Sequence, residues 1–348
     1  MIRRLRSILH TRILRNILML AILGAGIHLI LPQIHELRTS GQVLASMAWW
    51  AVGLAFVAQA FSYIGSGFML QGFLETTRQK IALWLSTLVV IAANSIGMVA
   101  GGTVGVSAAI YRWTGGSEGS MKGATLASLL SPLFINFMLT LISIFGLVHL
   151  ILAHSLTKAQ ALGFSLTPLV LALVLSSVLL AVRYRSRAVR TVLWVSRQIG
   201  RLRRRPFDPL PIQLEAEDLF NALDELLHGA WQKPALGAFL SVLFDMLTLY
   251  CMFLATGFQI SASVLMAGYG LPLLLGKAAF ILPGGVGIVE SSMALLYNGL
   301  GVPQQTTVIV VLGYRLISFW LPSIAGFPVG AFLEQSQGKL TRKEKVSI

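Results

Sequence analysis

The sequence predicts an all-α polytopic membrane protein with about six full transmembrane helices and two re-entrant helical hairpins, arranged as an inverted repeat. Of its 348 residues, 55% are hydrophobic and only 11% are charged, whereas soluble domains carry about 25% charged residues. Lys and Arg gather in four short regions, and two glycine-rich runs interrupt the apolar segments. The composition excludes a cytosolic enzyme and a disordered regulator, and the single cysteine, Cys251, excludes a disulfide scaffold.

Six stretches are predicted to cross the membrane completely, since a spanning helix needs about 20 mostly apolar residues. They cover about 13–31, 46–73, 124–152, 166–182, 235–257 and 306–333. The first, which Pro32 ends, has five arginines before or at its start. It lacks the small-residue cleavage site of a signal peptide, so we expect an uncleaved anchor. Trp49 and Trp50 begin the second span, as interfacial aromatic residues often do.

The basic residues predict the orientation, because cytoplasmic loops are enriched in Lys and Arg. The N-terminal arm, residues 78–80, residues 183–205 and the tail after residue 335 together hold 20 of the 27 Lys and Arg residues. Residues 183–205 contain nine arginines and no acidic residue. We therefore expect all four regions, including both termini, to be cytoplasmic, with the chain in the inner membrane of a bacterium.

This orientation requires two apolar segments to turn back inside the membrane. If every segment crossed once, the nine arginines would lie outside the cell. The conflict disappears if residues 82–100 enter from the cytoplasm and return as 104–114, and residues 262–282 enter from outside and return toward residue 299. The residues assigned to these turns are Gly101, Gly102 and Gly105 in the first, and Pro283, Gly284, Gly285 and Gly287 in the second. Transporters built from inverted repeats place the substrate site where such broken helices meet.

The same segments predict the domain organisation. One transmembrane domain covers residues 1–335, with a first half at about 10–182, a cytoplasmic connection at about 183–234 and a second half at about 235–335; a basic tail covers 336–348. The connection is too short for a nucleotide-binding domain. Its arginines either only set the topology or also lie on anionic lipid. We expect no nucleic-acid partner, because no soluble domain remains to present them.

Four ionisable residues fall within the apolar segments of the second half: Asp245, Lys277, Glu290 and Arg315. Each costs about 2.5–3.5 kcal/mol on membrane insertion and therefore marks a candidate site. We expect Glu290 to pair with Arg315, and Asp245 to pair with Lys277. These pairs either hold helices together or leave Arg315 or Lys277 to attract an anionic headgroup, whose phosphate suits the planar fork of arginine.

No catalytic signature occurs in the sequence, which lacks a nucleophile elbow, a zinc-protease motif and a phosphate-binding loop. We therefore expect no enzymatic activity, no cofactor and no metal ion. Asn94 and Asn136 are expected to form interhelical hydrogen bonds or to line a cavity.

The most specific pattern lies in the last 70 residues. It comprises the run from Pro283 to Glu290 (PGGVGIVE), the run from Gly299 to Pro303 (GLGVP), and Tyr314-Arg315 followed by Trp320 and Pro322. With it, the chain resembles the lysylphosphatidylglycerol synthase transmembrane region, a flippase-like family, over about residues 10–335. Carried over by position, the resemblance marks Gly284, Gly285, Gly287, Glu290, Tyr314 and Arg315.

The resemblance implies a protein that translocates lipid. The fused synthases add a soluble catalytic domain after such a region, whereas this chain ends about 15 residues past its last span, so we expect the translocating half alone. It would move a lipid or a lipid-linked anionic headgroup between leaflets, without its own ATPase. The residues expected at the headgroup are Arg315, Lys277, Glu290, Asp245, Tyr314 and Asn94. The alternatives are a non-transporting accessory subunit of a lipid or cell-envelope biosynthetic enzyme and an intramembrane lipid transferase.

Overall fold

The computed structural model describes residues 45–99, 102–115, 121–152, 183–203, 229–278 and 283–344, together with six single residues between 176 and 224. Every regular element in these residues is a helix, and none of them lies in a strand. The all-α prediction is therefore confirmed. The first expected span, most of the span at 166–182 and the turn residue Gly101 lie outside the described residues.

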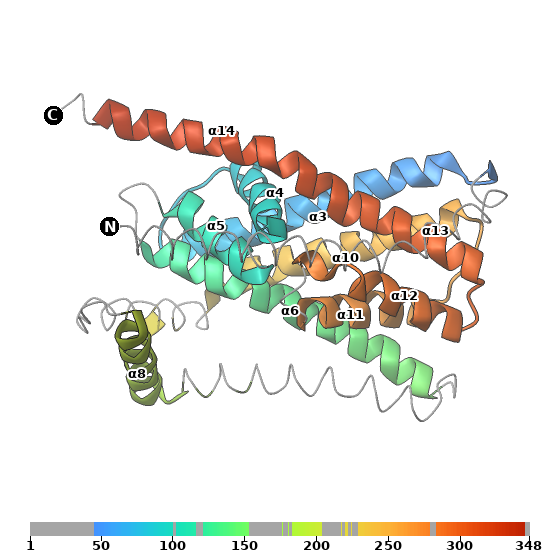
Figure 1. Ribbon diagram of the computed structural model, residues 1–348, viewed down its shortest axis with the longest axis horizontal. Helices are drawn as coiled ribbons and strands as arrows, with labels where there is room; N and C mark the ends of the chain where they lie inside the picture. Colours follow the sequence, from blue (N-terminus) through green and yellow to red (C-terminus); the bar gives the residue numbers. More distant parts are fainter. Residues whose placement is uncertain are drawn as a thin grey trace, which may run out of the picture.

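Four helices are long and apolar enough to cross a bilayer. They are α3 (Trp49–Thr76), α6 (Met121–Leu152), α10 (Gln232–Ala255) and a continuous helix made of α13 (Gln304–Arg315), the π-helical segment η3 (Leu316–Trp320) and α14 (Leu321–Glu344). All four extend along the long axis of the molecule (Figure 1). They correspond to four of the six expected spans.

The outer surfaces of these helices are apolar, as contact with lipid requires. Exposed large apolar side chains include Phe56, Phe61, Phe145, Phe239, Ile324 and Phe327. Such extended apolar surface is rare on soluble monomers. Trp49 and Trp50, at the start of α3, are each 68% exposed, and Trp231, just before α10, is 46% exposed. Exposed tryptophans at helix ends are typical of membrane–water interfaces, so the chain is a polytopic membrane protein.

Two helical hairpins, at opposite ends of the bundle, fill the space between the long helices (Figure 1). The first consists of α4 (Leu83–Val99) and α5 (Thr103–Thr114). The second consists of α11 (Ala262–Ala278), the 3-10 turn η2 (Pro283–Gly285) and α12 (Ile288–Gly299).

The first hairpin returns the chain to the end of the bundle from which it entered. Gln79, in the loop before α4, donates a hydrogen bond of 2.7 Å to the carbonyl of Thr114 at the end of α5. The following helix, α6, therefore begins beside the end of α3. This return is the one that the distribution of basic residues predicted.

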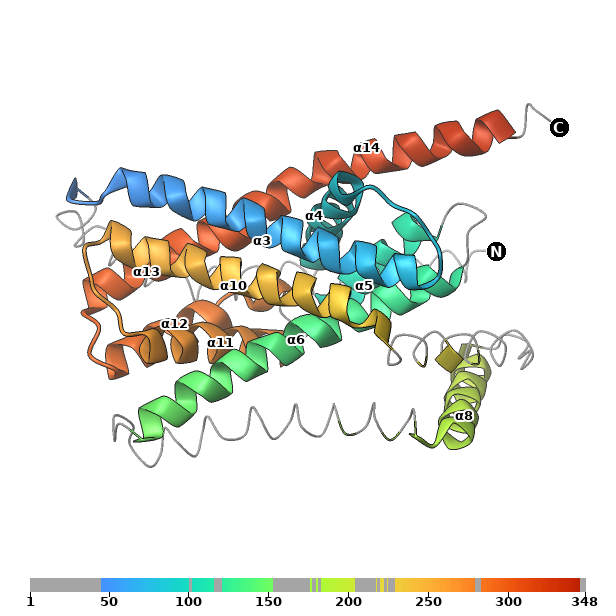
Figure 2. The ribbon, with the colours of Figure 1, turned by 180° about the vertical axis from the view of Figure 1, so that it is seen from behind.

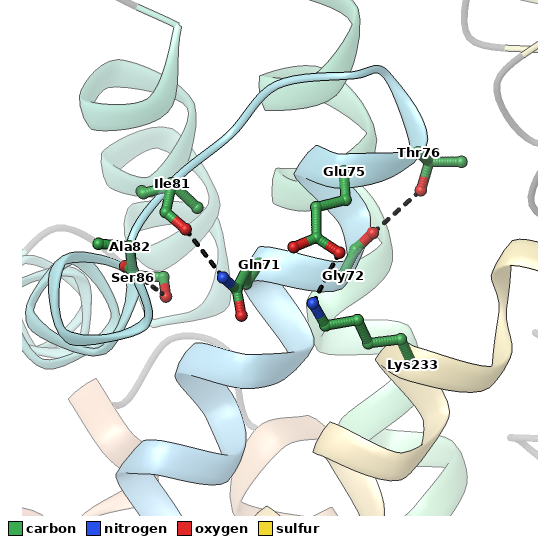
Figure 3. Close-up of polar contacts among 8 residues, drawn as sticks. All are labelled: Gln71, Gly72, Glu75, Thr76, Ile81, Ala82, Ser86 and Lys233. Atoms are coloured by element: carbon green, nitrogen blue, oxygen red, sulfur yellow. Dashed lines mark hydrogen bonds and ion pairs between the residues drawn. The ribbon is translucent and has the colours of Figure 1, made fainter.

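Helices α3 and α10 are antiparallel and approach each other closely. At one end the amide of Ala48 donates to the carbonyl of Ala255 at 2.8 Å. At the other end Lys233 Nζ lies 2.6 Å from Glu75 Oε2 (Figure 3). Between them, a Cβ atom on Gly237 would lie 2.4 Å from the amide nitrogen of Met69. Only glycine permits this backbone separation, a common device in membrane helix pairs.

Each long helix that follows one hairpin packs against the other hairpin. Helix α6 packs on α11, and α14 packs on α4. Glycines lie at both crossings: a Cβ on Gly146 would be 2.5 Å from the amide nitrogen of Ala267, and one on Gly326 would be 2.5 Å from the carbonyl oxygen of Ile91. Each half of the chain therefore packs against the hairpin of the other half.

Three of the four basic regions lie at one end of the bundle. Figures 1 and 2 show that α8 (Arg185–Arg203), the loop after α3 and the C-terminal end of α14 gather there. The N-terminal arm lies outside the described residues. The clustering agrees with the expectation that these three regions face the same compartment.

The glycine contact between α3 and α10 predicts a specific packing defect. Gly237→Val should lower the free energy of unfolding in detergent by about 1–3 kcal/mol, because the added atoms overpack the crossing. Gly53→Val, on α3, is the control, since a Cβ there meets nothing within 4 Å. Equal losses for the two variants in denaturant titrations would contradict the role assigned to Gly237.

Candidate functional site

A cavity of about 310 Å³ lies between the two hairpins, with walls from both hairpins and from all four long helices. Five residues expected at the headgroup line it: Asn94, Asp245, Lys277, Tyr314 and Arg315. The expected turn residues that line it are Gly102, Gly284 and Gly285. Glu290 is fully buried and lies behind Arg315. The residues of the second half that the sequence singled out are therefore gathered around one cavity.

Glu290 and Arg315 form a buried ion pair, as expected. Arg315 Nε lies 2.6 Å from Glu290 Oε1, and the two side chains are only 5% and 1% exposed. The other carboxylate oxygen of Glu290 accepts a 2.7 Å hydrogen bond from the amide of Gly287, at the N-terminus of α12. The carboxylate thus caps the second arm of the hairpin while it binds a cation from the next helix.

Arg315 also holds the turn of the second hairpin. Its Nη2 donates a 3.0 Å hydrogen bond to the carbonyl of Gly284, and its guanidinium lies 4.3 Å from the centre of the Phe319 ring. Gly284 has a φ of 61°, and a Cβ there would collide with that ring. Only glycine combines this left-handed conformation with the close approach of an aromatic side chain.

Asp245 is bound by two tyrosines and not by Lys277. Tyr269 and Tyr314 donate hydrogen bonds of 2.8 Å and 2.7 Å to the same carboxylate oxygen, Oδ2. Both phenol rings are buried, whereas the carboxyl group reaches the cavity. Charge-assisted hydrogen bonds of this kind stabilise a carboxylate without neutralising it.

Lys277 has a neutral partner. Its Nζ donates a 3.0 Å hydrogen bond to Asn136 Oδ1 on α6, so the interhelical role expected for Asn136 is confirmed. Among the described residues, Lys277 and Asp245 face the same cavity without forming the direct ion pair that we expected. Instead, the carboxylate of Asp245 accepts from the two tyrosines, and the ammonium of Lys277 donates to the amide of Asn136.

A polar stripe on α3 also faces the cavity, and the sequence analysis missed it. Gln59, Ser62, Tyr63 and Ser66 all line the wall, and Ser66 Oγ lies 2.7 Å from Ser241 Oγ on α10. The spacing of three, one and three residues is that of one face of a helix. The helical period of these polar residues is visible in the sequence, but none of them carries a charge, so the intramembrane charges alone do not mark them.

A proline interrupts α6 where it borders the cavity. Pro132 lines the wall and has no amide hydrogen to donate to the carbonyl of Ser128. Ser107, on α5 of the first hairpin, donates a 2.7 Å hydrogen bond to that carbonyl. The carbonyl that the proline leaves free on α6 therefore binds the first hairpin.

Two polar atoms in the cavity wall have no hydrogen-bond partner among the described residues. They are Gln59 Oε1 and Ser318 Oγ, both buried. Ser318 lies in η3, directly after Arg315, and π-helical turns of this kind are frequent at functional sites. Buried polar atoms usually find a partner, so these two are positions at which a ligand or water can bind.

Because Glu290 and Arg315 form a buried ion pair, removing one of the two charges should destabilise the protein strongly. Glu290→Gln should lower the free energy of unfolding by about 3–5 kcal/mol, because it leaves Arg315 buried without an anion. Adding Arg315→Met should restore much of the loss by removing the second charge. Glu75→Gln, which breaks the exposed pair of Figure 3, should cost less than about 1 kcal/mol.

Denaturant titration in detergent measures all three variants. A loss for Glu290→Gln no larger than that for Glu75→Gln would contradict the stabilising role of the buried pair.

Several known proteins are similar to this chain in sequence. A UPF0104 membrane protein of Methanocaldococcus jannaschii is 27% identical over 200 residues, which cover 57% of this chain and 57% of the relative. A UPF0104 membrane protein of Methanothermobacter thermautotrophicus is 39% identical over 87 residues, 25% of this chain and 26% of the relative. One from Pyrococcus horikoshii is 34% identical over 86 residues, 24% of each chain. The chain thus spans just over half of the first relative and about a quarter of the others.

The family comparison extends over most of the chain. The model of the lysylphosphatidylglycerol synthase TM region matches residues 16–326. This range contains both hairpins, the buried ion pair and every described residue that lines the cavity. The expected resemblance is confirmed, and the chain belongs to the family of the lysylphosphatidylglycerol synthase TM region.

Proposed function

We propose that the protein moves a lipid with an anionic headgroup between the two leaflets, without nucleotide hydrolysis of its own. The observation that carries the proposal is the cavity between the hairpins, which Lys277 lines and where, among the described residues, its ammonium has an uncharged amide as its hydrogen-bond partner. An ammonium in a low-dielectric cavity attracts a phosphate strongly, because little water screens the charge.

The size of the cavity supports binding of a headgroup alone. At about 310 Å³ it is at the lower end of the range for small-molecule pockets, about 300–1,000 Å³. Long hydrocarbon chains do not fit in this volume. They would remain in the bilayer, against the apolar outer surfaces of the long helices.

The polar residues around the cavity divide into two groups. Arg315 is held by Glu290 and by the carbonyl of Gly284, so we assign it mainly to stabilising the hairpin, with one edge at the cavity. Lys277 and Asp245 have neutral partners and are assigned to the headgroup. Gln59 and Ser318 would supply further hydrogen bonds from their unpartnered atoms.

An inverted repeat would explain how such a site is exposed to each leaflet in turn. The order α3, hairpin, α6 in the first half corresponds to the order α10, hairpin, α13–α14 in the second. Helices α3 and α10 are antiparallel, and each hairpin packs against a long helix of the opposite half. Rocking of one half against the other around a central site is the mechanism that this architecture supports.

The proposal predicts that Lys277 controls the rate of lipid exchange. Lys277→Gln should slow the exchange of fluorescent phosphatidylglycerol in liposomes by about 10- to 100-fold, because a charged hydrogen bond contributes about 1.5–3 kcal/mol. Lys277→Arg should retain part of the activity. Lys233→Gln is the control, since that lysine lies at the end of α10 and pairs with Glu75.

The outcomes separate the three candidate functions. Wild-type exchange that survives in Lys277→Gln would refute the assigned site. Absence of exchange in the wild type, with a lipid-biosynthesis enzyme co-purifying, would favour the accessory subunit. A modified lipid formed by the purified protein would favour the intramembrane transferase.

The proposed orientation has its own test. With the basic regions in the cytoplasm, a cysteine introduced at Gln198 in a Cys251→Ala background should react with a membrane-impermeant maleimide only after the cells are opened. Cysteine at Gly257, in the loop after α10 at the opposite end, is the control and should react in intact cells. Labelling of position 198 from outside would reverse the orientation.

A further inference from the structure

Helix α8 differs from the long helices in its direction and from every other described helix in its composition. It lies crosswise to the long helices, at the end of the bundle where α14 terminates (Figures 1 and 2). Its 19 residues include six arginines and no acidic residue. If the long helices cross the membrane, a crosswise helix at their end runs along the membrane surface.

The two faces of α8 are different. One face is covered: Val189 is buried against Phe220, and Arg185 donates hydrogen bonds to the side chain of Asn221 and to the carbonyl of Glu217. Three described residues of the connection, Glu217, Phe220 and Asn221, therefore contact α8 on this side.

The opposite face of α8, which we call the outer face, consists of Arg187, Arg190, Trp194 and Arg197. Successive members are three or four residues apart, so they share one side of the helix. All four are exposed, and the Trp194 side chain is 62% exposed. Arg187 also lies 5.0 Å from the ring centre of Tyr184, itself 48% exposed. Trp and Tyr are enriched at the membrane–water interface, and basic residues near the surface are attracted to anionic lipid.

We propose that the outer face of α8 binds the anionic phospholipid headgroups of the surrounding leaflet. The arginines pair with lipid phosphates, and Trp194 inserts at the level of the headgroups. The charge of the helix matches this partner, because a surface with only positive residues is attracted to an anionic membrane and each basic residue strengthens the attraction about fivefold. This binding is separate from the central cavity and does not require that the protein translocate lipid.

The contacts of the connection with α8 lie away from the outer face. Phe220, Asn221 and Glu217 contact Arg185 and Val189, on the side of α8 away from the outer face. Arg187, Arg190 and Arg197 are exposed and lie on the other side of the helix from these contacts.

The experiment measures how deeply the outer face lies in the membrane. Gln198→Cys, exposed on the same side as Trp194, carries a nitroxide spin label in a Cys251→Ala background. The full chain is placed in nanodiscs of phosphatidylcholine alone or of phosphatidylcholine with phosphatidylglycerol. The label's accessibility to oxygen, which partitions into lipid, is compared with its accessibility to a water-soluble nickel complex.

The expected result is a shift toward oxygen in the discs that contain phosphatidylglycerol, and a smaller shift at high salt, which screens surface charges. Arg187→Gln with Arg190→Gln should abolish the shift. Arg78→Gln with Lys80→Gln, which removes two exposed basic residues at the same end of the bundle, should leave it unchanged.

Three results would overturn the proposal. The first is equal accessibility in the two lipid compositions. The second is a shift that survives loss of Arg187 and Arg190. The third is protection from both reagents in both compositions, which would mean that protein covers the outer face. Lipid-exchange rates do not enter this measurement, so its failure would leave the proposed translocation standing.

Discussion

The ion pair between Glu290 and Arg315 solves the main difficulty of a hairpin that ends inside a membrane. A helix that breaks there leaves backbone amides and carbonyls without partners, and no water is present in the hydrocarbon region to bind them. Glu290 accepts from the amide of Gly287, and Arg315 donates to the carbonyl of Gly284. The two side chains also neutralise each other. One ion pair therefore supplies hydrogen-bond partners to the backbone on both sides of the turn and balances its own charges.

The first hairpin has a similar geometry, but different contacts stabilise it. The amide of Gly102 donates to the carbonyl of Gly97 across its turn, and Ser107 donates to the carbonyl that Pro132 leaves free on α6. Helix α14 covers α4 at the close contact of Gly326 with Ile91. The turn of the first hairpin is thus held by neutral hydrogen bonds and small-residue packing, and its only described ion pair, between Arg112 and Glu334, is exposed. The turn of the second hairpin depends on a buried ion pair. Asp245, Lys277, Glu290 and Arg315, the four charged residues singled out in the second half, lie at the cavity or beside the second turn.

The sequence predicts more of the fold than of the candidate site. The number and position of the arginines required the chain to reverse direction twice, and the reversals occur at the glycine runs. The pair of Glu290 and Arg315 could be predicted because Glu290 directly follows the turn of the second hairpin and Arg315 lies in the span that comes next. The partners of Asp245 could not be predicted, since Tyr269 and Tyr314 come from different helices whose rotation depends on packing. The polar stripe from Gln59 to Ser66 carries no charge, so only its period distinguished it from the apolar background.

The π-helical segment that follows Arg315 determines how one helix serves both halves of the protein. A π-turn closes over one residue more than an α-turn, so the side chains after Trp320 are rotated relative to those before Leu316. Arg315 consequently points at the second hairpin while Gly326 meets α4 of the first. Removing one residue from this segment would restore a uniform helix and turn the two faces by about 100° relative to each other. The number of residues in this segment therefore matters as much as their identity, because it sets the angle between the two contacts that one helix makes.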